Sequence, residues 1–532
     1  MRKQIDVPAK LDSFEQVRRF IEQILQEERV TSEVINENIL VIEEVFVRIA
    51  ENYEVDDEII NITVSETFGE IKVFLKFSGE RFNIDFNNGD IYDPGAIILS
   101  KYEDKIGLKY RKRDNTIRII ARRRFDKIGR WSIIGIALAL IVYAVVNIFL
   151  SKEQQAVLDS EWIKPLENMF ASGILLIAAP VTFLSLVTNI TNVAVLVDNR
   201  LQISSLVKKI ARTSITSILI ALVYYLILKG TIGRYVGMSD AASPGNISGT
   251  DAKEIFFNFI PDNLLGAFDE LLPFQVIMLG VFTAAGIISC NKHFDAVKVI
   301  FDALYALACR MLGIIMLFLP AAAFLSFLDM LLFDGARELL KCGLLILIIL
   351  FGMIIIVAIR LIFMKAKGVP AITVLRRCWP AIIENFRINS PIDAVPYNTR
   401  FCNKEFGVRM EKLDLELPVF AEISLGGNCY IISLVTLILF QYAGLNLGPF
   451  EIAIILLIVL GLSLGAPNQA GSVLVGLMVM AKFTQIDITF MCTVIYCEVF
   501  FSRVASVLNA LSDISSEIVD IYVEKKHESR KL

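Results

Sequence analysis

The hydrophobic pattern of this chain changes abruptly near residue 125. Charged residues are frequent before that point, whereas long uncharged runs dominate from Trp131 onward. A run of about 20 apolar residues is long enough to span a bilayer as a helix. Seven such runs in series predict an α-helical polytopic membrane protein: 131–150, 171–197, 213–228, 271–290, 311–328, 342–359 and 425–450.

Three interruptions in the second half predict helices that break inside the membrane. Residues 452–481 carry no charge, yet Gly465-Ala-Pro-Asn-Gln-Ala-Gly471 divides them into two short arms. Proline and glycine here would leave backbone groups unpaired in lipid, so we expect a re-entrant hairpin whose tip lies within the protein. A second hairpin is expected at about 376–400. Gly426 and Gly427 predict an unwound helix between them. Broken helices of this kind mark substrate sites in transporters.

The last long helix carries a polar stripe. Its polar residues recur at intervals of three or four and cover roughly 80° of one helix face. Such groups are costly in a membrane and usually face the bundle interior, where they form either a binding site or a polar packing seam. The stripe consists of Glu498, Ser502, Ser506, Asn509 and Asp513.

The first 124 residues predict a soluble α+β sandwich. Apolar residues follow a helical period in 13–28 and 33–52. They alternate in 60–64, 71–75 and 116–121, which predicts strands of a mixed sheet with helices on one face.

Charge and composition narrow the class of protein. The net charge of −4 lacks the excess of basic residues that is typical of nucleic-acid-binding proteins. Two histidines exclude a histidine metal site or a Ser-His-Asp triad, and the eight cysteines lack disulfide or zinc spacing, so we expect no enzyme. The polar N-terminus is unlike a cleaved signal peptide. Basic residues between Arg122 and Arg130 precede the first apolar run and predict a cytoplasmic N-terminus at the inner or plasma membrane.

The order hairpin, broken helix, hairpin and polar-striped helix resembles the dicarboxylate/amino acid:cation symporter family, which has the glutamate-transporter fold. The resemblance covers about residues 131–520. Asn389-Ser-Pro-Ile392 resembles the family's first hairpin tip, Ser424-Leu-Gly-Gly-Asn428 its unwound segment and Ser463–Gly471 its second tip. The resemblance implies a homotrimer in the lipid bilayer that moves a small-molecule substrate with Na⁺ or H⁺.

The resemblance also assigns candidate site residues. Glu422 and Glu498 are candidates for proton coupling, because burial favours the protonated form of a carboxylate. A partial Na⁺ site is expected at Ser424, Asn509 and Asp513. The substrate-binding candidates are Ser390, Gly427, Asn428, Pro467, Asn468, Gln469, Ser502, Ser506 and Asn509.

The chain departs from the family's motif at three positions. Ser502 stands where the family has the acid that binds the substrate amino group, and Ala505 replaces the arginine that grips a carboxylate. Gly426 replaces a sodium-binding aspartate. A small neutral amino acid therefore suits the site better than a dicarboxylate. Glu422 has a structural alternative, an ion pair with Arg503 or with another buried cation.

The soluble domain resembles the GHKL-type ATPase domain of anti-sigma-factor kinases. Glu43 matches the family's base, but Val47 stands where a magnesium-binding asparagine belongs, and valine cannot coordinate Mg²⁺. Asn87 and Gly89 match the adenine-binding box, with asparagine replacing aspartate. We therefore expect a degenerate domain that binds no ATP and instead contacts a cytoplasmic regulatory protein.

Three domain-level segments and two leading functions follow. We expect a cytoplasmic domain at 1–124, a transport domain at 125–520 and a charged cytoplasmic tail at 521–532. The leading hypothesis is cation-coupled symport of a small amino acid or dicarboxylate. The alternative is a non-transporting sensor that passes the state of a degenerate transporter fold to a protein bound by the soluble domain. A third hypothesis, an ATP-dependent kinase, is disfavoured by Val47 and Asn87.

Overall fold

The chain divides into two compact units, residues 1–125 and 126–532, each with its own hydrophobic core. The computed structural model describes residues 2–27, 32–52, 59–67, 70–82, 99, 106–111, 113–122, 127–196, 200–235, 260, 263, 266–269, 272–290, 293–334, 336–423, 425–442, 447–467, 469, 471–483 and 488–528.

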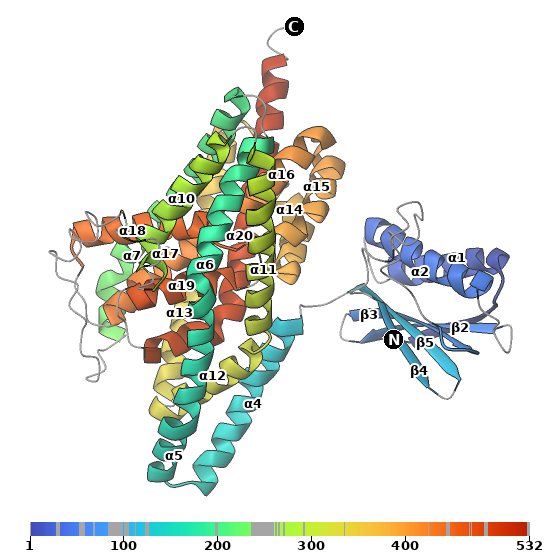
Figure 1. Ribbon diagram of the computed structural model, residues 1–532, viewed down its shortest axis with the longest axis horizontal. Coiled ribbons are helices and arrows are strands. Elements are labelled where there is room, and N and C mark those ends of the chain that lie inside the picture. The colour runs from blue at the N-terminus through green and yellow to red at the C-terminus, as the bar shows by residue number, and fades with distance from the viewer. Residues whose placement is uncertain are drawn as a thin grey trace. The chain divides into compact units, whose positions relative to one another are not determined.

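The first unit is a five-stranded sheet with two helices on one face (Figure 1). The strand order is β1-β2-β3-β5-β4, and every described pair is antiparallel. The elements are β1 (Arg2–Pro8), a 3₁₀ turn η1 (Leu11–Ser13), α1 (Phe14–Glu27), α2 (Ser32–Asn52), β2 (Ile59–Thr67), β3 (Glu70–Ser78), β4 (Ile106–Arg111) and β5 (Asp114–Arg122).

Alternation along the strands explains why helices cover only one face. Ile60, Ile62 and Val64 of β2 are buried against the helices, and β3 and β5 repeat the pattern. The expectation of a mixed sheet is wrong for the described strands. Two residues separate β2 from β3 and β4 from β5, and so short a connection permits only antiparallel pairing.

The second unit is helical, and among its described residues six helices are long and apolar enough to cross a membrane. Its elements are α4 (Lys127–Phe149), α5 (Lys152–Leu158), a π-helical turn η3 (Asp159–Ile163), α6 (Lys164–Leu196), α7 (Arg200–Tyr235), α9 (Gly266–Asp269), α10 (Pro273–Ser289), α11 (Phe294–Met316), α12 (Leu319–Asp334), α13 (Ala336–Ala366), α14 (Ala371–Ile388), α15 (Pro391–Phe406), α16 (Met410–Ile423), α17 (Gly426–Tyr442), α18 (Pro449–Leu464), α19 (Ser472–Phe483) and α20 (Ile488–Glu528).

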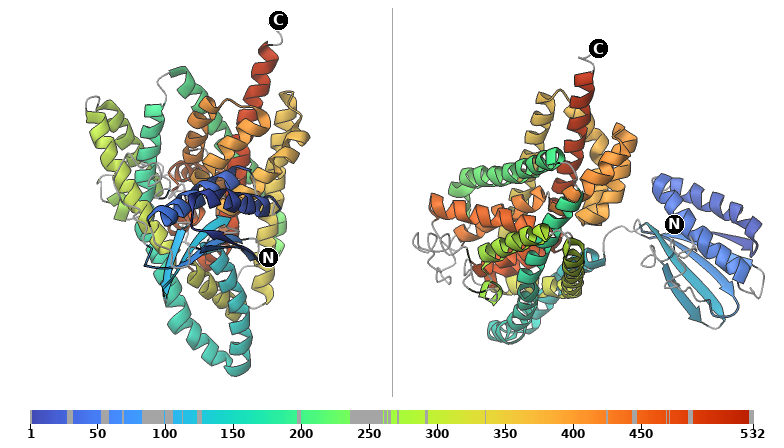
Figure 2. Two further views of the ribbon diagram at one scale, coloured as in Figure 1. Left: turned by 90° about the vertical axis from the view of Figure 1, so that its right-hand side faces the viewer. Right: turned by 45° about the horizontal axis from the view of Figure 1, so that its top comes forward.

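Burial separates the inner helices of this unit from the outer ones. Only 22% of the apolar window in α4 is buried, whereas 94% of the window in Met410–Gln441 is buried. Most exposed side chains of α4 are apolar, among them Ile133, Leu138 and Ile141, as a lipid-facing helix requires. Helix α20 runs lengthwise through the unit, as the views in Figure 1 and Figure 2 show. The polar elements of the second half therefore lie where lipid does not reach them.

One predicted span is wrong as a single helix. The run 311–328 breaks at Leu317 and Phe318, so that α11 ends at Met316 and α12 begins at Leu319. Pro320 lies in the first turn of α12, where its missing N–H needs no partner, and it disfavours helical geometry in the residue before it. Hydrophobicity alone did not show this break because both sides of it are equally apolar.

The core of the first unit generates a stability prediction. Phe46 is completely buried beneath the sheet, whereas Leu40 on the same helix is 51% exposed. We expect Phe46→Ala to lower the free energy of unfolding of this unit by about 3–5 kcal/mol, because it removes buried area and leaves a cavity. Leu40→Ala should change it by less than about 0.5 kcal/mol. Urea-dependent proteolysis of the full-length protein within residues 1–125 measures both, and equal effects would contradict this core.

Candidate functional site

The polar stripe of α20 is buried along its whole length. Glu498, Ser502, Ser506, Asn509 and Asp513 are each less than 9% exposed. Helix α20 packs against α12, α14, α17 and α19, which keeps this face away from lipid. Desolvated polar groups need partners within the protein, so their hydrogen bonds show which elements the stripe joins.

Ser502 and Ser506 of the stripe form hydrogen bonds with residues at and just before the turn between α14 and α15. Asn389 ends α14 in the left-handed conformation, with φ of 56°, and its Nδ2 donates to Ser502 Oγ at 3.2 Å. Ser390 begins α15, and its hydroxyl accepts the amide N–H of Asp393. One turn along α20, Ser506 Oγ donates to the carbonyl of Asn385 at 3.1 Å. Two hydroxyls of the stripe thus face the turn between these helices.

Asn509 connects α20 to the break between α16 and α17. Its Oδ1 accepts the backbone N–H of Gly427 at 2.6 Å, and its Nδ2 donates to Asn428 Oδ1 at 3.3 Å. Asn428 in turn donates to Ser472 Oγ, at the start of α19, at 3.0 Å. A single chain of side-chain hydrogen bonds therefore links α20, α17 and α19.

The glycines at this break allow close approach of the backbone. A Cβ added to Gly427 would collide with the backbone of Ala505 on α20. A Cβ on Gly426 would meet Thr213 and Ser217 of α7. Where the resemblance expects a sodium-binding carboxylate, the space beside Gly426 is therefore already filled by α7.

The two candidate proton carriers lie in different surroundings. Glu498 is 1% exposed, and neither carboxylate oxygen has a hydrogen-bond partner among the described residues, although Arg503 acts on it electrostatically. Glu422 is half-buried and accepts from Asn192 Nδ2 of α6 at 3.3 Å. Arg503 lies 5.9 Å from the Phe386 ring centroid and donates to the carbonyl of Val499, whereas the cation that acts electrostatically on Glu422 is Lys298.

Asp513, a candidate sodium ligand, is under the influence of a fixed cation. Arg360 of α13 attracts Asp513 electrostatically and donates to Ser512, the preceding residue, and to Ser515 Oγ at 3.4 Å. Asp513 also lines a small cavity with Asn385 and Asn398. A sodium ion at Asp513 would therefore share its ligand with a guanidinium that the sequence did not indicate.

The break between α18 and α19 is held by α6 and α11. Ser185 Oγ donates to the carbonyl of Ala466 at 3.2 Å, and Asn189 Nδ2 donates to the carbonyl of Leu464 at 3.2 Å. Asn189 also reaches the carbonyl of Glu422 at 3.1 Å. Gln469 donates to the carbonyl of Cys309 at 3.0 Å, so its amide nitrogen is bound to α11. Pro467 is buried beside these contacts.

Several predicted residues cannot be placed, and several others were missed. Ser424, Asn468, Asn87 and Gly89 lie outside the described residues. The sequence argument did not assign site roles to three buried asparagines and one serine, whose short polar side chains beside helix breaks were the available signal. These residues are Asn385, Asn389, Asn398 and Ser472.

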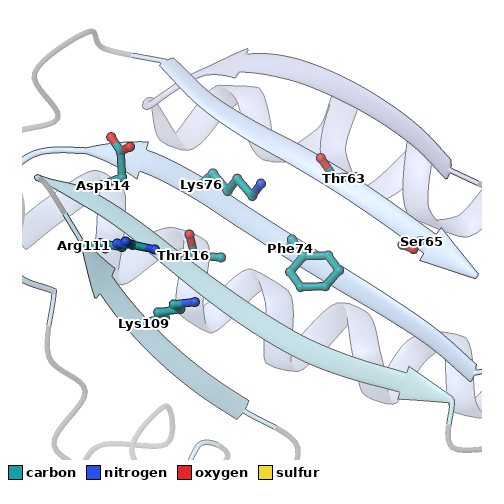
Figure 3. A pocket seen from close by; sticks show the side chains of 8 residues that line it. All are labelled: Thr63, Ser65, Phe74, Lys76, Lys109, Arg111, Asp114 and Thr116. Carbon is teal, nitrogen blue, oxygen red and sulfur yellow. The ribbon is translucent and has the colours of Figure 1, made fainter.

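In the first unit, a hollow on the sheet does not include the candidate nucleotide residue Glu43. Glu43 is an exposed residue of helix α2, and Val47 on the same helix is half-buried. The hollow, of about 810 Å³, lies on the sheet face that the helices leave open (Figure 3). Lys76, Lys109 and Arg111 line it, together with Asp114.

Comparison with known protein families identifies the family of the helical unit. Residues 130–520 match the sequence model described as the sodium:dicarboxylate symporter family. That match covers well over half of the chain and includes every break described above. No curated protein matches the chain.

The central hydrogen bonds of the site generate a prediction. Asn509→Ala leaves the Gly427 N–H and Asn428 Oδ1 buried without this partner, at a cost of about 1–3 kcal/mol for each group. We expect a clearly lower melting temperature of the purified full-length protein. Ser516→Ala is the control, because Ser516 bonds only to the carbonyl of Ser512 on its own helix. Equal melting temperatures for wild type and N509A would contradict this network.

Proposed function

Because the chain belongs to the sodium:dicarboxylate symporter family, we propose that it is a secondary active transporter that couples cation movement to the transport of a small amino acid or dicarboxylate across the membrane. The observation that carries the proposal is the buried network that joins all three helix breaks to α20. A polar stripe that served only to pack helices together would not need to contact three helix breaks. The substrate would bind among these groups, with α14–α15 and α18–α19 as re-entrant hairpins.

A small neutral amino acid fits the polar groups best. Ser502 and Ala505 stand where the family carries an acid and an arginine, so neither the fork for a side-chain carboxylate nor a charged partner for an amino group is present at those positions. What remains is rich in hydroxyl and amide groups, including Ser506, Asn389 and Asn509. These donate and accept neutral hydrogen bonds, which suits a compact polar substrate.

The proton is the coupling ion that these residues favour. A sodium ion requires several oxygen ligands, but Gly426 supplies no carboxylate and Asp513 is already attracted to Arg360. Glu498 offers a buried carboxyl group whose oxygens have no hydrogen-bond partner among the described residues. Intramembrane carboxylates of this kind serve as proton relays in transporters.

The contacts of α6 and α11 supply the parts that alternating access would rearrange. Ser185 and Asn189 of α6 donate to backbone carbonyls of the second hairpin and of α16. In the other direction, Gln469 of the second hairpin donates to a backbone carbonyl of α11. Moving the hairpins against α6 and α11 must break these bonds and expose the carbonyls to other partners. We place the N-terminus in the cytoplasm, on the basic residues before α4, and propose a homotrimer on the family resemblance.

Uptake by the full-length protein in proteoliposomes tests the proposal. A panel of amino acids and dicarboxylates is offered with a Na⁺ gradient, with a pH gradient and with neither. Gradient-driven accumulation of any member supports transport. Substrate-induced thermal stabilisation without uptake would instead favour the sensor alternative.

Glu498 provides the sharper test of coupling. Glu498→Gln keeps the size of the side chain but cannot exchange a proton, so we expect loss of uptake driven by a pH gradient with substrate exchange retained. Asp295→Asn is the control, because Asp295 is an exposed carboxylate in the first turn of α11. Unchanged pH-driven uptake in E498Q would refute the proton role.

The first unit is proposed as the docking module for an acidic regulatory protein. Lys76, Lys109 and Arg111 share the open sheet face, and none of them forms an ion pair with another described residue. An acidic partner would neutralise this charge.

Charge reversal on the open sheet face tests this docking role. We expect Lys76→Glu with Lys109→Glu to abolish recovery of the partner by affinity purification of the full-length protein, whereas Lys10→Glu, at an exposed residue, leaves it intact. Equal recovery of the partner with the wild-type protein, the double variant and K10E would exclude this face as the docking surface.

A further inference from the structure

A pocket between α7, α13 and α20 contains two arginines that face the same space. Arg212 and Arg360 both line this cavity of about 120 Å³, and they are close enough to repel each other. Much of the remaining wall is aliphatic, including Ile220, Ile359 and Val519. Two like charges beside an apolar wall repel each other, and an anion bound between them would offset this repulsion.

The neighbouring charges leave this pocket positive. Asp513 attracts Arg360 from the inner side, which offsets one of the two guanidinium charges. Lys367 adds a further cation at the rim, where its ammonium lies 5.8 Å from the Phe363 ring centroid. Arg212 stacks on the same ring at 4.9 Å. Neither Arg212 nor Arg360 forms an ion pair with a carboxylate among the described residues.

Both arginines lie between one and two turns inside the ends of membrane-length helices. Arg212 lies five residues inside one end of the span Val207–Gly230, and Arg360 lies six residues inside one end of Gly343–Ala366. At 1.5 Å per residue, both lie roughly 8–9 Å from the ends of their helices. Exposed apolar side chains, among them Ile215 and Leu219, continue from the pocket along the lipid-facing surface of α7.

We propose that this pocket binds the phosphate of an anionic membrane phospholipid. The guanidinium groups would bind the phosphate oxygens by charge-assisted hydrogen bonds, and the acyl chains would lie along the exposed apolar residues of α7 and α13. Arg360 keeps its bonds to Ser512 and Ser515 while its remaining N–H groups face the lipid. The site depends on membrane insertion of α7 and α13 and does not depend on the substrate or the coupling ion.

Lipid titration of delipidated full-length protein tests the site. Short-chain phosphatidylglycerol is added to protein in a neutral detergent, and the apparent Kd is read from thermal shift and from bound lipid counted by native mass spectrometry. Phosphatidylcholine of the same chain length and inorganic phosphate form the other two arms. We expect saturable binding of phosphatidylglycerol only.

Variants at one arginine localise the binding. Arg212→Gln should weaken phosphatidylglycerol about tenfold or more, and Arg212→Lys, which keeps the charge but loses the planar fork, should fall between it and wild type. Arg310→Gln is the matched control, because Arg310 is an exposed arginine of a membrane-length helix outside the pocket.

Three results would overturn the proposal. Equal weakening by R212Q and R310Q would show non-specific charge attraction. Equal binding of phosphatidylcholine, whose choline group cancels the charge of its phosphate, would show that the pocket does not select a lipid with net negative charge. Saturation of the same site by inorganic phosphate at millimolar concentration would assign it to a small free anion instead of a lipid.

Discussion

The constraint on which the helical unit depends is that every backbone group at membrane depth must find a partner within the protein. Helices satisfy it automatically, whereas the breaks between α14 and α15, between α16 and α17, and between α18 and α19 each free backbone groups. Short polar side chains from neighbouring helices bind backbone groups at or beside these breaks. Asn509 accepts the N–H of Gly427, and Asn189 donates to the carbonyls of Glu422 and Leu464. The buried asparagines are thus structural requirements of the breaks before they are anything else.

The same requirement explains how a site can form with few charges. Amide and hydroxyl groups that satisfy a broken backbone also present donors and acceptors to whatever enters between the breaks. Glycine contributes by its missing side chain, since the backbone at Gly427 approaches Ala505 too closely for any other residue. The residues proposed to bind the substrate are therefore the same residues that satisfy the broken backbone.

The sequence alone could predict those features that depend on local periodicity. The stripe of α20 and the break at Gly465–Gly471 follow from spacing and from proline and glycine chemistry. The pairing of Ser502 with Asn389, and of Asp513 with Arg360, could not be predicted, because residues 113 and 153 positions apart are brought together only by tertiary packing. The break near Pro320 and the antiparallel pairing do have local signals, which are the proline itself and the two-residue connections between strands. The hydrophobic pattern contains neither signal.

Arg360 shows why the missed tertiary contacts matter for the chemistry. Its guanidinium supplies a permanent positive charge next to the carboxylate that the family resemblance offers to sodium. This covalently attached cation stabilises the negative charge of Asp513 in this structure. Glu498, four turns away on the same helix, has no hydrogen-bond partner for its carboxylate oxygens among the described residues, and Arg503 attracts it as Arg360 attracts Asp513. Each carboxyl group of the stripe therefore lies in the field of a fixed guanidinium, so the charges of α20 are set by tertiary contacts and not by the spacing of the stripe alone.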